Sequence, residues 1–244
     1  MKFVIKTLSA TLLAGAALVA VPANAQVAGI ATLDTTDAIM QTKAFAQAYQ
    51  QIGTTFTSNS QMIQTKRKEI NDINAQLDTN KDKNLTQEEL DAAIKAKNPL
   101  LTQLEAKERE IAQLQQPIVT AQAFAVESIA DRYAAAQQQV ITQKKINMIL
   151  SPEAFIWAPE TVDVTKAVTA ALDVAVPSVG ITPPANWQPK QSTGGLYEQI
   201  QQRLLTAARV QAIRNAQAQQ ATQPAANPAT PAAPAPQQPQ PESR

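Results

Sequence analysis

The sequence predicts a mostly helical α+β protein in which a long antiparallel coiled-coil helical hairpin projects from a small three-stranded base. Three observations carry this prediction: two long apolar stripes at alternating four- and three-residue spacing, a short polar segment between them, and strand-like runs on either side. A heptad stripe on a helix is buried only against another stripe. Two stripes joined by a short turn are therefore expected to fold back on each other.

Residues 1–25 have the pattern of a secretory signal peptide. Lys2 and Lys6 supply a positive start, Leu8 to Val21 is an apolar run, and residues 22–25 read Pro-Ala-Asn-Ala, a small-x-small cleavage site. The segment is too short and wrongly flanked for a stable membrane span, and no later run approaches the required length. We therefore expect an exported protein that is processed near Gln26 and has no membrane span.

The composition removes most of the usual catalytic chemistry. The chain has no Cys and no His, which excludes disulfides, thiol catalysis, histidine bases and histidine metal ligands. Aromatic residues make up 4% and Gly occurs six times, which leaves little material for a buried catalytic pocket. Without Lys2 and Lys6, the 21 basic residues fall to 19 against 20 acidic ones, and this balance argues against nucleic acid as a partner. We expect no enzyme activity and no required cofactor.

A base strand over 26–34 and a helix start at 35 open the mature chain. Val27 to Leu33 is partly β-branched and ends at an acidic residue, which is typical of a strand that leads into a helix. Asp34 is then the expected N-cap, and Asp37 is the acidic residue three positions later.

The hairpin arm is expected over 35–145, with its tip at 78–89. Its first stripe consists of Phe45, Tyr49, Ile52, Phe56, Asn59, Ile63, Lys66, Ile70, Ile73 and Leu77. Its second consists of Leu90, Ile94, Lys97, Leu101, Leu104, Glu108, Ile111, Gln115, Ile118, Gln122, Ala125 and Ile129. The spacing alone leaves an ordinary helical bundle open as an alternative.

Antiparallel pairing around this tip also predicts a register. The expected facing pairs are Ile73 with Ile94, Ile63 with Leu104, Asn59 with Glu108 and Phe56 with Ile111. Lys66 and Lys97 would extend outwards beside aliphatic partners.

The arm is expected to bend at one level. Gly53 to Ser60 is rich in β-branched and backbone-competing residues and is a poor helix sequence. Pro117 lies near that stretch on the return helix, where it removes a helical hydrogen bond. Pro99 is a second possible break, closer to the tip.

The tip, Asp78 to Glu89, supports two interpretations. Oxygen-bearing side chains at loop positions 1, 3, 5, 7, 9 and 12 follow the spacing of an EF-hand, whose ligands converge on one Ca²⁺ ion. Lys83 stands at position 6, where the EF-hand pattern has Gly. Thr86 to Glu89 is alternatively a capping box for the return helix, which leaves the earlier alternation unexplained. The calcium interpretation predicts five metal ligands: Asp78, Asn80, Asp82, Asn84 and Glu89.

After the arm, residues 146–176 are expected to complete the base. Ile146 to Leu150 and Ala154 to Trp157 are strand-like runs joined by a turn. Asp163 is the expected cap of a short helix over Val164 to Leu172.

The rest of the chain forms an extension. Residues 177–192 are a Pro-rich linker in which Trp187 is expected to be a packing anchor. A C-terminal helix is expected over 193–214, with an apolar stripe along one face. Residues 215–244 are an Ala/Pro/Gln tail without large apolar residues, and we expect this tail to be disordered.

This order of elements resembles the Skp/OmpH family of periplasmic chaperones. Two segments carry the resemblance, together with the signal peptide: Gly29 to Phe45 (GIATLDTTDAIMQTKAF) and Ile146 to Asp173 (INMILSPEAFIWAPETVDVTKAVTAALD). Both match the family pattern, in which an aliphatic strand ends at an acidic residue and a short helix later starts with Asp-Val-Thr. The resemblance covers about Val27 to Asp173.

The resemblance implies a homotrimer whose short strands pool into one β-barrel-like body. Three arms would then enclose a cavity in which unfolded outer-membrane proteins are held in the periplasm without ATP. Family members are often distinctly basic, whereas residues 34–145 hold 13 basic and 14 acidic side chains. The alternative is a non-enzymatic periplasmic coiled-coil structural or adaptor protein that acts through its C-terminal helix and binds unfolded clients poorly.

Overall fold

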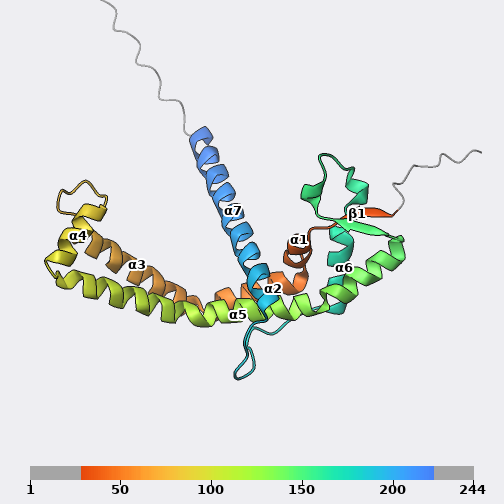
Figure 1. The fold of residues 1–244 in the computed structure, drawn as a ribbon, viewed down its shortest axis with the longest axis horizontal. Helices are drawn as coiled ribbons and strands as arrows, with labels where there is room; N and C mark the ends of the chain where they lie inside the picture. The colour runs from red at the N-terminus through yellow and green to blue at the C-terminus, as the bar shows by residue number, and fades with distance from the viewer. Residues whose placement is uncertain (1–28, 223–244) are drawn as a thin grey trace, which may run out of the picture. The chain divides into compact units, whose positions relative to one another are not determined.

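The structure, a computed structural model, describes residues 29–222, with side chains to residue 219, and is mostly helical (Figure 1). The chain divides into two compact units at Gly194. The signal peptide predicted at 1–25 lies outside the described residues, as does the predicted tail after 222. Among the described helices, none has a stretch long and apolar enough to cross a membrane.

The base contains a two-stranded parallel sheet. Strands β1 (Ile30–Thr32) and β2 (Met148–Leu150) pair along their whole length, and Thr32 forms an isolated parallel bridge with Asp163. Parallel strands need a long crossover connection, and the helices between them provide it. Gly29 precedes β1 with φ +85°, and a Cβ atom there would lie 2.3 Å from Nδ2 of Asn147. Only glycine therefore fits this close approach of the two strand ends.

The predicted third base strand, Ala154–Trp157, is wrong within the described single chain. Pro152–Ala154 instead forms a 3₁₀ turn, η1, and Glu160–Val162 forms a second one, η2. Proline has no N–H to donate to a sheet, and its fixed φ favours the start of such a turn. Phe155 does have extended backbone angles (φ −111°, ψ 135°), but no strand of the described chain pairs with it.

The outgoing side of the arm consists of three consecutive helices: α1 (Thr35–Met40), α2 (Lys43–Thr55) and α3 (Thr57–Leu77). The predicted cap of α1 is confirmed, because Asp34 Oδ1 accepts a hydrogen bond from the Asp37 N–H at 2.9 Å. The break between α2 and α3 falls at Phe56, inside the stretch predicted to bend. The Thr54 and Thr57 hydroxyls donate to carbonyls of the preceding turn there, which competes with regular helical geometry.

The return side consists of α4 (Gln87–Lys95) and α5 (Pro99–Lys144). Asn98 caps α5 by accepting from the Leu100 N–H at 3.0 Å, and Pro99 occupies the first helical position, where its missing N–H has no cost. The predicted break at Pro99 is therefore confirmed. Helix α5 continues through Pro117 and ends at Lys144, and the next residue, Lys145, caps it with a left-handed backbone (φ 53°).

The two sides pack in a register different from the predicted one. Asn59 Nδ2 donates to the Leu114 carbonyl at 3.1 Å instead of lying opposite Glu108. Ile73 packs in a cluster with Leu100, Leu101 and Leu104, whereas Ile94, its predicted partner, is 56% exposed. The reason is α4: it is a separate helix inside the tip, so the long return helix begins at Pro99 rather than at Leu90. The facing positions move towards the C-terminus by about one heptad.

Helix α6 (Thr165–Ala175) closes the base against α1 and α5. Val168 and Leu172 are fully buried, as is Ile129 of α5, and they form the apolar interior of the base. The Thr169 hydroxyl donates to the Ala38 carbonyl at 3.0 Å, which ties α6 to α1. Asp163 accepts from the Thr165 N–H at 2.8 Å, so the predicted helix starts one residue later than expected.

Helix α7 (Gln191–Thr222) is longer than the predicted 193–214. The additional residues, 215–222, read NAQAQQAT and are rich in the strong helix formers Ala and Gln. The first proline after them is Pro224, so nothing in their composition interrupts the helix earlier.

Candidate functional site

The segment that follows the arm exposes large apolar side chains on the base. Met148 of β2 is half exposed, Ile156 is fully exposed, and Trp157 is 79% exposed. Apolar side chains of this size are usually covered in soluble proteins, and a group of them is typical of an interaction surface. These side chains are therefore exposed apolar residues of the base that a partner surface would need to cover.

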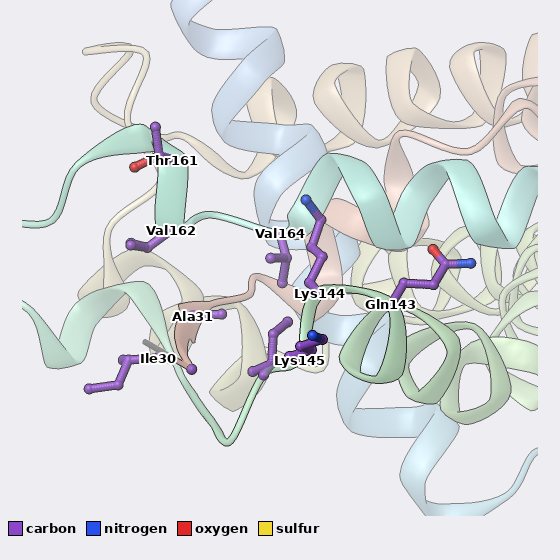
Figure 2. Close-up of a pocket in the computed structure, with 10 residues that line it drawn as sticks. Ile30, Ala31, Gln143, Lys144, Lys145, Thr161, Val162 and Val164 are labelled. Carbon is purple, nitrogen blue, oxygen red and sulfur yellow. The ribbon is translucent and has the colours of Figure 1, made fainter. Parts of the chain in front are cut away.

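A cavity of about 420 Å³ lies beside β1. Figure 2 shows that its walls come from β1, from the end of α5 and from the segment around η2. Its described lining residues include Lys144 and Lys145 but no carboxylate.

Four alternating charges join α3 to α5 in the arm. Lys66 Nζ lies 3.2 Å from Glu69 and 2.9 Å from Glu110, while Lys107 Nζ lies 2.8 Å from Glu69 and 3.8 Å from Glu110. The hydrogen bond to Glu110 raises the pKa of Lys66, and hydrogen bonds from Lys107 and Lys66 lower the pKa values of Glu69 and Glu110 respectively. Lys66 was expected beside an aliphatic partner. Its ion pairs instead show which residues of α3 and α5 face each other. The four side chains together carry no net charge.

The predicted calcium ligands lie at the tip, where backbone N–H groups donate to the side-chain oxygens of Asp78, Asn80, Asp82 and Glu89. Asp78 Oδ1 accepts from the Lys81 N–H and Oδ2 from the Lys83 N–H, both at 2.8 Å. Asn80 and Asp82 each accept from the N–H two residues ahead, also at 2.8 Å. Lys81 and Lys83 both have left-handed backbones, with φ values of 60° and 69°. Lys83 thus adopts the conformation for which the EF-hand pattern uses Gly.

Glu89 is the most heavily bonded of the predicted ligands. Its Oε1 accepts from the Thr79 N–H and hydroxyl, both at 2.8 Å, and from the Asn80 N–H at 3.1 Å. Its Oε2 accepts from the Thr86 N–H at 3.1 Å and from the Thr86 hydroxyl at 3.0 Å. These bonds, with the Thr86 N–H first, lower the pKa of Glu89 to about 2. The reciprocal Thr86–Glu89 contacts confirm the predicted capping box of α4.

The capping box and the calcium loop share Glu89, so the two interpretations compete for one carboxylate. Within residues 29–222, no group of three or more acidic side chains is arranged to hold a metal ion. Asn84 and the other predicted ligands stay a prediction, which calcium titration would test.

Comparison with known proteins shows which family this chain belongs to. The family model of OmpH-like outer membrane protein matches residues 29–172, more than half of the chain. A crystal structure of an OmpH-like outer membrane chaperone candidate from Caulobacter crescentus CB15 is 20% identical, with a TM-score of 0.41, over 62% of this chain and 87% of that one. A search of curated proteins found no match. By the family match, this chain belongs to the OmpH-like outer membrane protein family.

Proposed function

We propose that this chain is an ATP-independent periplasmic holdase chaperone that binds unfolded outer-membrane proteins between the arms of a homotrimer and keeps them soluble for membrane insertion. The observation that carries the proposal is the family match over the base and the arm, residues 29–172.

The proposed trimer accounts for the incomplete base. Strands β1 and β2 have three residues each and form a sheet of only two strands. Such a sheet is marginal in water without further strands or packing. Phe155 is extended but pairs with no strand of the described chain, and Ile156 and Trp157 next to it are exposed. A second and third copy would supply strands to pair with this edge and apolar surface to cover these side chains.

The proposed client surface combines scattered apolar residues with balanced charge. Met62, Ile94 and Val119 are exposed along the arm. Each could bury its side chain against a client for at most roughly 1.5–3 kcal/mol, so no single contact would hold a client tightly. Many such contacts would keep an unfolded chain soluble and still release it. Because the arm is nearly neutral, we expect capture to depend weakly on salt.

Aggregation of a urea-diluted outer-membrane barrel protein, followed by light scattering, tests this function. The mature chain should suppress the scattering. The double variant Ile156→Ser/Trp157→Ser should lose trimerisation and suppression together, because it removes the two most exposed apolar side chains near β2. Val174→Ser is the matched control, since Val174 is also highly exposed but lies on α6.

Two results would contradict the proposal. A native chain that lets the client aggregate would remove the holdase function. A double variant that remains a fully active trimer would show that the subunits do not assemble through this surface of the base. A stable stoichiometric complex with another envelope protein, without client binding, would support the adaptor alternative instead.

A further inference from the structure

Residues 176–194 follow the base and include the first residues of α7. This segment returns to the arm and packs against both of its sides. We name this segment the strap. Ile181 of the strap is buried in one cluster with Ala48 and Ile52 of α2 and with Ala121 and Ala125 of α5. Val179 packs against the same cluster. A single strap side chain thus bridges the outgoing and return helices.

Glu127 of α5 anchors the strap. Its side chain is 6% exposed, and it accepts three hydrogen bonds from the strap: from Trp187 Nε1 at 3.1 Å, from the Lys190 N–H at 2.8 Å and from the Thr193 hydroxyl at 2.6 Å. Burial raises the pKa of Glu127, but these three hydrogen bonds outweigh it and hold the pKa below its usual value. A buried carboxylate whose three hydrogen bonds all come from one distant segment is a specific attachment point.

Two further contacts extend the attachment along α5. The Trp187 ring meets the Phe124 ring edge-on, with centroids 5.4 Å apart, and Lys190 forms an ion pair with Asp131. Phe124, Glu127 and Asp131 are three and four residues apart, so they lie on one face of the helix. The strap therefore follows this face rather than touching α5 at one point.

The buried arm residues that share a cluster with Ile181 lie on the base side of the two weak points of the arm, and Phe56 and Ile118, at the weak points, pack against the edge of that cluster. The α2–α3 break is at Phe56, and the strap contacts α2 at Ala48 and Ile52. Pro117 interrupts the hydrogen-bond ladder of α5, and the buried α5 members of the cluster, Ala121 and Ala125, follow it on the base side.

We propose that the strap clamps α2 against α5 and thereby confines bending of the arm to the level of Phe56 and Pro117. The strap lies beyond residues 29–172, which the family model matches. The clamp determines at which level along its length the arm bends. It is independent of what the arm binds, and it goes beyond the proposed chaperone function.

Hydrogen exchange with mass spectrometry on the full mature chain tests the clamp, with Glu127→Gln as the main variant. Gln has the size of Glu but places an NH₂ group where one carboxylate oxygen accepted, so at least one strap donor then faces another donor. Amides of the strap should exchange at least tenfold faster, and amides of α2 should accelerate with them. Amides of α3 beyond Ile63 should keep the native rates, because they lie on the far side of the break.

Glu105→Gln is the matched control, because Glu105 lies on the same helix in an exposed ion pair with Arg109, and native exchange is expected throughout. Ile181→Ala is a second, independent variant: it removes the side chain that bridges α2 and α5, and α2 should again exchange faster. Opening of the strap while α2 keeps its native rates in both variants would overturn the clamp. Unchanged strap exchange in Glu127→Gln would overturn the role of Glu127 as its anchor.

Discussion

Truncation of Ile73 tests how the tip of the arm is held together. Ile73 is 6% exposed and packs with Leu77, Ala93 and leucines of α5. Ile73→Ala removes three carbon atoms, which corresponds to about 2.4 kcal/mol at about 0.8 kcal/mol for each buried carbon. The cavity left behind adds to this, and buried Ile→Ala changes span about 2–5 kcal/mol. Because α4 is short and can partly collapse into the space, we expect about 3 kcal/mol.

This loss should appear locally, because the tip cluster is separate from the base interior. Hydrogen exchange should accelerate by roughly a hundredfold in the amides of α3 and α4 near the tip, since about 1.4 kcal/mol corresponds to a factor of ten. Amides of β1 and α6 should be unaffected. Met62→Ala on the same helix is the control, because Met62 is 43% exposed and should cost less than about 0.5 kcal/mol.

A double-mutant cycle separates the observed register from the sequence-predicted one. Ile73→Ala should couple to Leu104→Ala, which shares its cluster, and should add independently to Ile94→Ala. Coupling to Ile94 rather than to Leu104 would refute the observed register. Uniform acceleration over the whole chain after Ile73→Ala would refute a tip that opens separately from the base.

The remaining predictions address the arm and its tip. Ile63→Asp should separate α3 from α5 and lower the helical circular dichroism signal while sparing the base, because it buries a charge; a full helical signal would contradict it. Asn59→Cys with Leu114→Cys should oxidise readily, whereas Asn59→Cys with Glu108→Cys should not. The bonds of Glu89 should stabilise the tip above about pH 4.5 and be lost as pH falls towards its pKa of about 2, an NMR-detectable change that Glu89→Gln should abolish. Calorimetric titration should detect saturable Ca²⁺ binding that the same variant removes, and a silent titration would end the calcium prediction.

Side chains close to the helix ends allowed several of these ends to be predicted from the sequence. The Asp34 cap and the Thr86–Glu89 capping box depend on side chains within three residues of the atoms they satisfy. Such features are present in the sequence as short patterns, so they could be placed before the fold was known. Pro99 was predicted as a break, but the Asn98 cap that starts α5 beside it was not predicted.

The register of the arm could not be predicted in the same way. Two heptad stripes align equally well after a shift of seven residues, so their spacing does not choose between registers. The choice depends on how the tip folds, and there α4 forms a separate helix before Asn98. The four-charge network around Lys66 was the available signal, because only the observed register places Lys66 and Lys107 beside opposite charges from both helices.

Glu127 carried no recognisable signal in the sequence. It lies inside a long helix between the buried residues Val126 and Ile129, and its partners lie about sixty residues further along the chain. Trp187 was expected to be a packing anchor, and its contact with Phe124 agrees with that expectation. The buried carboxylate that receives it becomes visible only when both segments are placed in three dimensions.

The most direct test of the central claim is the mass of the mature chain by size-exclusion chromatography with light scattering, alone and after mixing with a urea-diluted outer-membrane barrel protein. A homotrimeric holdase should give three copies alone and a discrete soluble complex of three copies with the client. A monomer, or a trimer from which the client aggregates away, would contradict this prediction.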